Sequence, residues 1–308
     1  MGRPDALTTE YMSDNDHFAD IFNYFLYDGR RVIKPENLRE KDRTTIALPH
    51  AYNAEKSDPI QRYRDVFKVL AAMEDDDAEY LLLGVEDQTN VHYAMPVRNM
   101  LYDAANYVMQ IEKAAKDKRE KKGLKKDEYL SGFAREDKLI PIITLVIFWS
   151  PSEWDGSRSI HEMFSVKDDS ILRFVPDYKI NLISPKDIDD KDFEKFETKL
   201  AEVLQFIKYS KNKTKLKEKV DSISDYQHMN RRDVELINEI TGAGIKIPQG
   251  TREVNMCVAI REMEKEAADK RLIDAIKNLM ETTKWTSDQA MKALGVSVEE
   301  QSRVMKML

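Results

Sequence analysis

Two short apolar runs separated by an acidic turn stand out in the hydrophobic pattern of the chain. The first run begins at Val66 and the second covers residues 80–85, with three consecutive aspartates at 75–77 between them. Apolar runs of this length that are joined by turn residues predict two adjacent strands. Polar residues follow the second run directly, since Glu86 and Gln88 stand at the end of a strand that is otherwise apolar.

The rest of the chain alternates between helical and strand-like spacing. Helices are predicted over residues 14–27, 95–122, 189–219 and 230–240, and one or two helices over 254–280; strands are predicted over 44–48, 139–150 and 177–183. The continuous apolar run at 139–150 is typical of a strand covered on both faces. After Pro185 the pattern is almost wholly helical, which predicts an α/β core at residues 1–185 and a helical C-terminal region at 186–308.

The polar end of the second strand is the main candidate site. Side chains two apart on a strand point to the same face, so Glu86 and Gln88 share a face. If Asp65 lies on the neighbouring strand, three oxygen-bearing side chains converge there. Desolvating an unpaired carboxylate is costly, and Mg²⁺ binds carboxylate and carbonyl oxygens, so these residues indicate a magnesium site.

The order Asp65, then Glu86-x-Gln88, resembles the PD-(D/E)XK nuclease signature with Gln in the Lys position. The surrounding sequence resembles one branch of that superfamily, the Rpn family of recombination-promoting nucleases, also labelled putative transposases. The matching segments are FADIFNYFLYDGRRVIKPENL (18–38), YRDVFKVL (63–70), YLLLGVEDQ (80–88), MPVRNMLYDAANY (95–107), SIHEMF (159–164) and NMCVAIREM (255–263). The resemblance implies a restriction-endonuclease-like α/β fold, in which a mixed central sheet is flanked by helices.

The same resemblance implies a metal-dependent endonuclease that hydrolyses phosphodiester bonds in double-stranded DNA, in recombination or mobile-element biology. Asp65 and Glu86 would bind Mg²⁺, for which Mn²⁺ could substitute, and Gln88 would orient the attacking water. An amide can hydrogen-bond water but supplies no positive charge, so less electrostatic help is expected than from a lysine. The Asp87 carbonyl is a further candidate ligand, whereas the Asp87 side chain is expected to point away from Glu86.

Two further residues have both a functional and a structural interpretation. In many nucleases of this superfamily an acid on the first helix approaches the metal, which makes Asp20 a candidate ligand; a solvated helix face is the alternative. Arg98, on the helix that follows the site, could orient a carboxylate or a phosphate bidentately, or could stack on Tyr102 at the surface. Asp65 and Glu86 could themselves be strand-end acids held by Arg64, by Arg98 or by backbone donors.

Basic residues concentrate between residues 113 and 126. The segment holds eight Lys or Arg and two acids, and Lys118 and Lys121 are candidate phosphate contacts. Such a run is also common at a solvated helix end. The net charge of −7 counts against a protein that coats nucleic acid, although bound metal ions supply local positive charge in a nuclease site.

Composition places the chain among cytoplasmic proteins. It has a single cysteine, Cys257, which excludes an internal disulfide, and no apolar run approaches the length of a membrane-spanning helix. The first residues lack the apolar segment of a signal peptide. His161 has no second histidine nearby, so a zinc site is not expected, and there is no Gly-rich phosphate loop.

The C-terminal tail repeats a helix-start signal. Thr286 and Ser297 each precede Gln or Glu by three residues, which is capping-box spacing. The pattern favours a structural helical hairpin over a DNA-reading helix-turn-helix, because the second helix would present two acids to phosphates. A second hypothesis for the whole chain follows: a catalytically degenerate nuclease-fold protein that binds DNA or protein through its helical half, which could also form a homo-oligomer.

Overall fold

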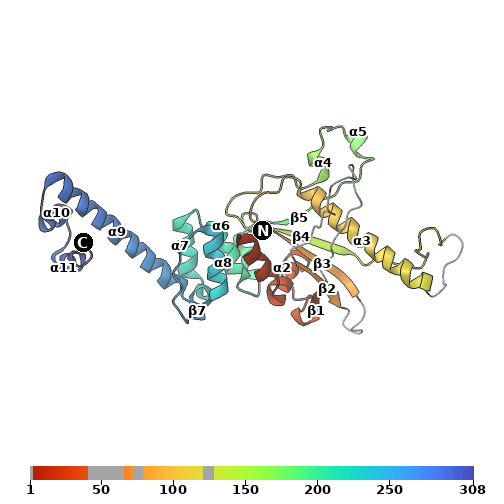
Figure 1. Ribbon diagram of the computed structural model, residues 1–308, viewed down its shortest axis with the longest axis horizontal. Helices are drawn as coiled ribbons and strands as arrows, with labels where there is room; N and C mark the ends of the chain where they lie inside the picture. The colour runs from red at the N-terminus through yellow and green to blue at the C-terminus, as the bar shows by residue number, and fades with distance from the viewer. Residues whose placement is uncertain (1–2, 41–65, 72–78, 121–127) are drawn as a thin grey trace, which may run out of the picture. The chain divides into compact units, whose positions relative to one another are not determined.

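The computed structural model describes residues 3–40, 66–71, 79–120 and 128–308 (Figure 1). The chain divides into two compact units. The first unit consists of Met1–Leu216 with Glu235–Ala243, and the second consists of Lys217–Val234 with Gly244–Leu308. The first unit therefore extends past residue 185, where the change of pattern along the sequence suggested a boundary.

A five-stranded mixed sheet forms the centre of the first unit. Its strands lie in the order β1 (Leu38–Glu40), β2 (Val66–Ala71), β3 (Glu79–Gln88), β4 (Ile142–Phe148) and β5 (Asn181–Ile183). The first three strands are antiparallel, whereas β4 and β5 are parallel to β3. The structure confirms the predicted pair of adjacent strands, with Val66 opposite Val85. The predicted strand at 44–48 lies outside the described residues.

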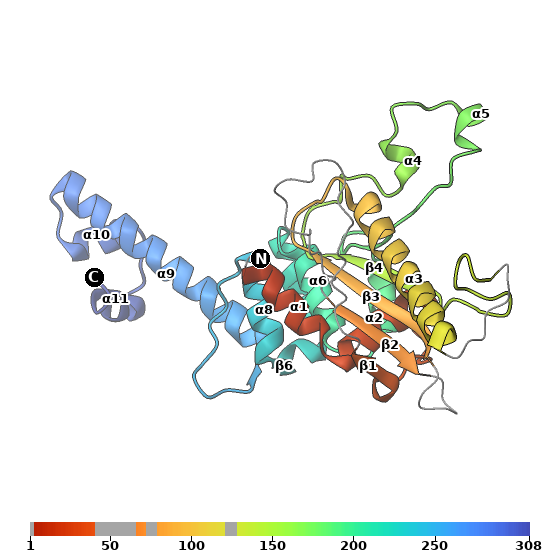
Figure 2. The same cartoon turned by 45° about the vertical axis from the view of Figure 1, so that its right-hand side comes forward.

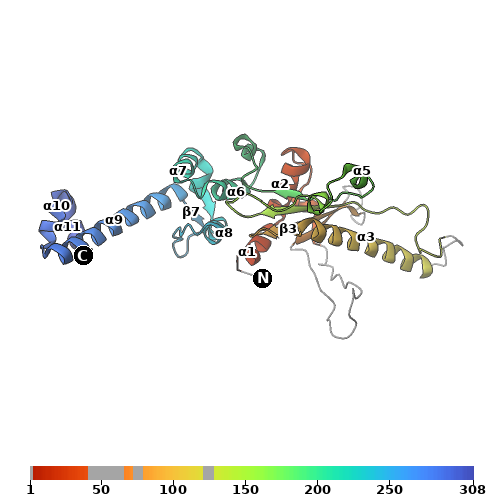
Figure 3. The ribbon, with the colours of Figure 1, turned by 90° about the horizontal axis from the view of Figure 1, so that it is seen from above.

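Helices lie on both sides of this sheet. Lys68 on β2 pairs with Leu83 on β3, and the Lys68 ammonium lies 5.0 Å from the ring centroid of Phe18 on α2 (Asn15–Tyr27). The side chain of Leu83 therefore faces α2, and Glu86, three residues further along β3, faces the other way. That other side is covered by α3 (Met95–Glu120), and Figure 3 shows α2 and α3 on opposite sides of the sheet.

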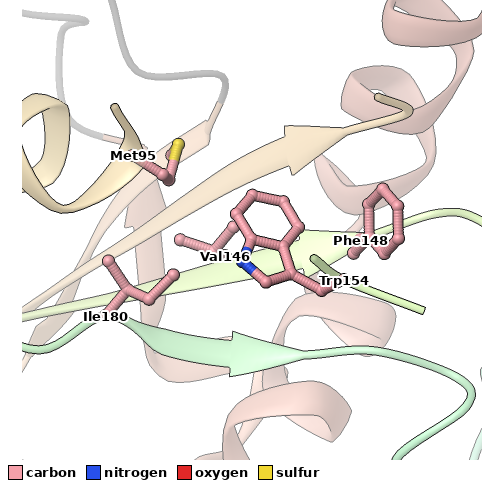
Figure 4. Packing of buried hydrophobic residues seen from close by; sticks show 5 residues of the cluster. All are labelled: Met95, Val146, Phe148, Trp154 and Ile180. Carbon is pink, nitrogen blue, oxygen red and sulfur yellow. The ribbon is translucent and has the colours of Figure 1, made fainter. Parts of the chain in front are cut away.

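The helix α3 makes the crossover between the parallel strands β3 and β4 (Figure 2). It agrees with the predicted helix at 95–122, and β4 agrees with the apolar run at 139–150. Beneath α3, Met95 packs with Val146, Phe148, Trp154 and Ile180 in one buried cluster, shown in Figure 4. This cluster fixes the first turn of α3 against β4, close to where β3 ends. Two short helices, α4 (Ile160–Met163) and α5 (Asp169–Leu172), lie in the connection from β4 to β5.

The N-terminal part holds one helix that the sequence pattern did not predict, α1 (Arg3–Met12). Its apolar residues are few, but Tyr11 and Met12 are buried. The predicted helix α2 begins after Asp14, whose side chain accepts a hydrogen bond from the Asp16 N–H. The chain then passes through a 3₁₀ turn, η1 (Pro35–Asn37), into β1.

The single helix predicted at 189–219 is wrong, because this stretch contains three helical segments. These are η2 (Asp190–Lys195), α6 (Leu200–Tyr209) and α7 (Lys213–Ser222). The first break has a tertiary cause: the backbone N–H groups of Glu197 and Thr198 donate to the carboxylate of Asp20 and not to a helical carbonyl. The helix α6 packs against α2, which explains why the first unit extends beyond residue 185.

The second unit is mainly helical, as the pattern after Pro185 predicts. Its elements are the end of α7, η3 (Ser224–His228), β6 (Met229–Asn230), the start of α8 (Arg231–Thr241), β7 (Glu253–Val254), α9 (Met256–Thr283), α10 (Ser287–Ala293) and α11 (Val298–Met305). Ile276 of α9 packs with Met291 of α10 and Val304 of α11 in one buried cluster. The predicted helical hairpin at the C-terminus is therefore present and packs on α9.

The chain is a mixed α/β protein. Within the described ranges, no helix is both long enough and apolar enough to span a bilayer.

Candidate functional site

The candidate site lies where β3 ends. Glu86 is fully buried on the face of β3 that α3 covers, and it pairs in register with Val146 of β4. Its Oε2 lies 3.0 Å from an Nη nitrogen of Arg98. A buried carboxylate needs an oppositely charged partner, and this ion pair supplies one. The structure thus brings together two residues that the sequence singled out.

The short connection between β3 and α3 places Arg98 beside Glu86. The helix begins at Met95, whose N–H donates to the His92 carbonyl, and Arg98 follows in its first turn. The Nε of Arg98 donates to the Tyr102 hydroxyl at 3.1 Å, and the guanidinium carbon lies 5.6 Å from the Tyr102 ring centroid. Tyr102 is itself almost fully buried. Arg98 is therefore held by the ring on one side and by Glu86 on the other.

The side chain of Asp87 takes the opposite direction. Its Oδ1 accepts a hydrogen bond of 2.7 Å from Nε1 of Trp149, and both residues are buried. The Trp149 ring in turn makes a T-shaped contact with the ring of Tyr11 on α1, with the ring centroids 6.2 Å apart. Strand alternation, which places Asp87 and Glu86 on different faces, explains this arrangement. The Asp87 carbonyl accepts from the Gln88 side-chain amide at 2.9 Å.

A pocket of about 270 Å³ opens beside these residues. It is lined by Asp5, Asp87, Gln88, Thr89, Asn90, Val91, His92 and Arg98. Gln88 is half-buried, and the Thr89 hydroxyl donates to the Asp5 carboxylate at 2.8 Å. No pattern in the sequence points to Asp5, because it reaches the pocket from α1 through a contact with Thr89, 84 residues away.

Asp20, the candidate metal ligand on α2, is held by hydrogen bonds within the protein. Its carboxylate accepts three hydrogen bonds, from the Glu197 N–H (3.0 Å), the Thr198 N–H (2.9 Å) and the Thr198 hydroxyl (2.6 Å). Burial raises the pKa of Asp20 above 3.8, and the three hydrogen bonds oppose that rise. These donors account for the buried carboxylate without a metal.

Of the two lysines that are candidate phosphate contacts, the structure describes only Lys118. Lys118 on α3 pairs with Asp137 at 2.6 Å, and this contact lowers the pKa of the Asp137 carboxyl. Lys118 is therefore engaged within the protein, although its side chain is 28% exposed. Lys121 and the candidate catalytic residue Asp65 lie outside the described residues.

The groups at the end of β3 are of the type that binds a hard cation, but the described residues supply too few of them. The Glu86 carboxylate, the Asp87 carbonyl and the Gln88 amide all carry oxygen, which Mg²⁺ prefers. Among the residues that the structure describes, however, no group of three or more His, Cys, Asp or Glu could hold a metal ion. In addition, Glu86 already pairs with a cationic side chain. A metal site here needs Asp65, or a rearrangement of Arg98, or both.

No family model, no curated protein and no solved structure matches the chain. The resemblance to recombination-promoting nucleases therefore rests on the sequence motifs alone.

Proposed function

We propose that this protein is a divalent-cation-dependent endonuclease that hydrolyses phosphodiester bonds in double-stranded DNA. The observation that supports this most is the fully buried Glu86 carboxylate beside a pocket at the end of β3. Asp65 directly precedes Val66, and Val66 pairs with Val85, the residue directly before Glu86. The described register is thus compatible with the two carboxylates of the motif serving one site.

The fold supports the same proposal. The first unit has an antiparallel strand pair, a crossover helix and a parallel strand, with helices on both sides of the sheet. We propose that this mixed sheet is the restriction-endonuclease-like core that the sequence motifs imply.

In this proposal, Asp65 and Glu86 hold Mg²⁺ or Mn²⁺, and Gln88 orients a water molecule by hydrogen bonding. The bound cation would supply a nucleophilic water of lowered pKa and would stabilise the charge that develops on the phosphate. Gln88 carries no charge, so the site lacks one charge-assisted contact that a lysine would give. That loss corresponds to roughly 2–3 kcal/mol, or about 50-fold in rate.

The proposed setting is cytoplasmic DNA recombination or mobile-element biology, and the substrate is duplex DNA. A chain of net charge −7 needs local positive charge to approach phosphates. The described part of α3 offers Lys113, Lys116 and Arg119 on its C-terminal turns, in addition to Lys118. Binding through these residues should weaken steeply as salt rises.

One observation favours a second candidate function. The ion pair with Arg98 gives the buried Glu86 carboxylate a structural role in which a metal is not needed to supply the opposite charge. The protein would then be a catalytically degenerate nuclease fold that binds DNA or protein through its helical C-terminal region, alone or as a homo-oligomer.

A paired measurement separates the two functions. Mg²⁺-dependent cutting of duplex DNA should be lost in Asp65→Ala and in Glu86→Gln, and both should also lose the rise in melting temperature that Mn²⁺ or Ca²⁺ gives the unmodified protein. Glu36→Ala, at an exposed position in the first unit, is the matched control and should keep both properties. Cutting that survives both site substitutions means that the site is wrong. Absence of any cation effect on the unmodified protein favours the degenerate module.

A further inference from the structure

The connection from β4 to β5 forms an arm, residues 159–179, which contains α4 and α5 and stands clear of the sheet in Figure 2. Ser159 and Lys179 form an antiparallel bridge at its base. Directly after the arm, Ile180 packs in the buried cluster of Figure 4. The base of the arm is therefore fixed to the core of the first unit.

Hydrogen bonds within the arm join its two halves. Nε2 of His161 donates to the Val175 carbonyl at 2.7 Å, and the His161 N–H donates to the Asp177 carboxylate at 3.1 Å. The Lys167 ammonium donates to the carbonyls of His161 and Glu162, at 3.1 and 2.9 Å. The arm is thus an ordered element with its own hydrogen bonds.

No residue of this ordered arm beyond Ile160 is buried, although seven of them are Val, Ile, Leu, Met or Phe. Four of the seven are exposed: Met163 (37%), Val166 (46%), Ile171 (52%) and Phe174 (76%). The Phe174 N–H donates to the Ile171 carbonyl, so these two side chains are neighbours on one helical turn. Apolar side chains that gather on the surface of an ordered element mark a protein interaction site.

The charges of the arm decide which partner fits it. Residues 161–179 hold four acids and three bases, which are Glu162, Asp168, Asp169 and Asp177, and Lys167, Arg173 and Lys179. More acids than bases make the arm unsuited to the phosphates of nucleic acid or of an anionic membrane. A surface that carries both signs is complementary to its own copy, because two-fold symmetry lets a base of each copy meet an acid of the other.

We propose that the arm is an interface between two copies of this chain, in which Ile171 and Phe174 pack against the same residues of the other copy. The guanidinium carbon of Arg173 lies 4.7 Å from the Phe174 ring centroid, so a cation adjoins the apolar pair and faces an acid of the other copy. Aromatic residues, Met and Arg are enriched in protein interfaces. This inference does not depend on the proposed nuclease function, and it places self-association in the first unit and not in the helical C-terminal region.

Sedimentation equilibrium of the full chain between about 1 and 100 µM, where small interfaces associate, tests this proposal. The unmodified protein should approach twice the chain mass of 35.8 kDa as its concentration rises. Phe174→Asp should raise the dissociation constant of the pair by about 30-fold or more, the effect of losing one well-packed aromatic contact. Arg173→Glu should raise it by about 10-fold, because it sets like charges against each other.

Three further variants keep the test decisive. Leu130→Asp is the matched control, because Leu130 is 94% exposed in the same unit but outside the arm, and should leave the dissociation constant unchanged. Val298→Asp tests the helical C-terminal region, since Val298 is 82% exposed on α11. If Phe174→Asp fails to fold, Ile171→Asp takes its place with the same expectation.

The outcomes decide where the chain pairs with itself. A chain that stays at 35.8 kDa over the whole range overturns the proposal, and the arm is then left for a different protein. Association that survives both Phe174→Asp and Arg173→Glu also overturns it, as does association that only Val298→Asp abolishes. Weaker pairing in both arm variants, with Leu130→Asp and Val298→Asp unchanged, supports it. DNA cutting enters none of these measurements, so failure here leaves the proposed function standing.

Discussion

Asp20 and Thr198 are 178 residues apart in the sequence, yet the Thr198 hydroxyl donates to Oδ2 of Asp20 at 2.6 Å. The same carboxylate also accepts the backbone N–H groups of Glu197 and Thr198. Asp20 thereby receives the N–H groups of the turn that precedes α6, which would otherwise be left without helical partners. The contact joins α2 to the start of α6 within the first unit.

Replacing Asp20 by Ala should lower the free energy of unfolding by about 3 kcal/mol, because the substitution leaves buried N–H donors without an acceptor. Urea denaturation, followed by circular dichroism, measures this loss. Asp16→Ala is the matched control, since Asp16 is exposed in the first turn of the same helix and should cost at most about 1 kcal/mol. Equal losses in the two variants would show that the hydrogen bonds of Asp20 contribute little.

Lys68 gives a prediction about pH. Its side chain is fully buried, and its ammonium donates to the Ser13 carbonyl at 2.6 Å and to Oδ1 of Asn15. Burial lowers the pKa of Lys68 below its ordinary value of 10.5, although Glu40 and Asp14 oppose this. Between the folded-state pKa and 10.5 the unfolded chain therefore binds more protons, so the contribution of Lys68 to stability rises with pH in that window.

The free energy of unfolding of the unmodified protein, relative to Lys68→Met, should therefore increase as pH rises toward 10.5. Denaturation at neutral pH and again near pH 10 gives the difference in unfolding free energy between the two proteins at each pH. Because the other titrating groups are the same in both proteins, their contributions cancel in this difference. Lys186→Met, at an exposed position, controls for the loss of one lysine. A difference that decreases with pH contradicts the lowered pKa.

The sequence predicts those parts of the fold that depend on neighbours along the chain. The strands β2, β3 and β4 follow from apolar runs, and α2 and α3 follow from helical spacing, because burial of one face imposes these periods. The break between η2 and α6 could not be predicted in this way. It depends on the Asp20 carboxylate, and no local pattern around Glu197 reports a side chain 177 residues away.

In the candidate site too, features that depend on neighbours along the chain could be predicted, and features that depend on tertiary contacts could not. Glu86 and Arg98 could be predicted as neighbours because a strand end and the first turn of the next helix are close along the chain. Asp5 could not be predicted, since it reaches Thr89 only through the packing of α1 beside β3. The sequence also left open whether Arg98 holds a carboxylate, and the answer depended on the 3.0 Å contact with Glu86. The role of Asp65 stays a prediction.

Gly29 is expected to tolerate no side chain. Its backbone has φ +80°, and an added Cβ would lie 2.6 Å from Cβ and 2.7 Å from the carbonyl oxygen of Lys195. Gly29→Ala should cost about 2–4 kcal/mol, which combines left-handed backbone strain with a clash against the backbone of η2. Gly242→Ala is the matched control, because Gly242 has φ +66° with no atom within 4 Å, and should cost about 1 kcal/mol. Chemical denaturation of both variants should show the larger loss for Gly29→Ala.

The two capping-box signals of the tail differ in geometry. The Thr286 hydroxyl accepts the Gln289 N–H at 3.3 Å, and the Thr286 N–H donates to the Gln289 side chain at 3.0 Å, so both halves of the box are formed. The Ser297 hydroxyl instead donates to the Glu300 carboxylate at 2.9 Å and makes no side-chain cap with the backbone of α11. Identical spacing in the sequence therefore gives one cap and one exposed side-chain contact.

Thr286→Ala should consequently destabilise the second unit by about 1 kcal/mol, because it leaves an N-terminal N–H of α10 without an acceptor. Ser297→Ala removes only an exposed hydrogen bond and should cost less than about 0.5 kcal/mol. Urea unfolding followed by circular dichroism measures the loss in both variants. Equal losses would mean that Ser297 caps α11 in solution. A larger loss for Ser297→Ala would show that α11, and not α10, limits the stability of the helical hairpin.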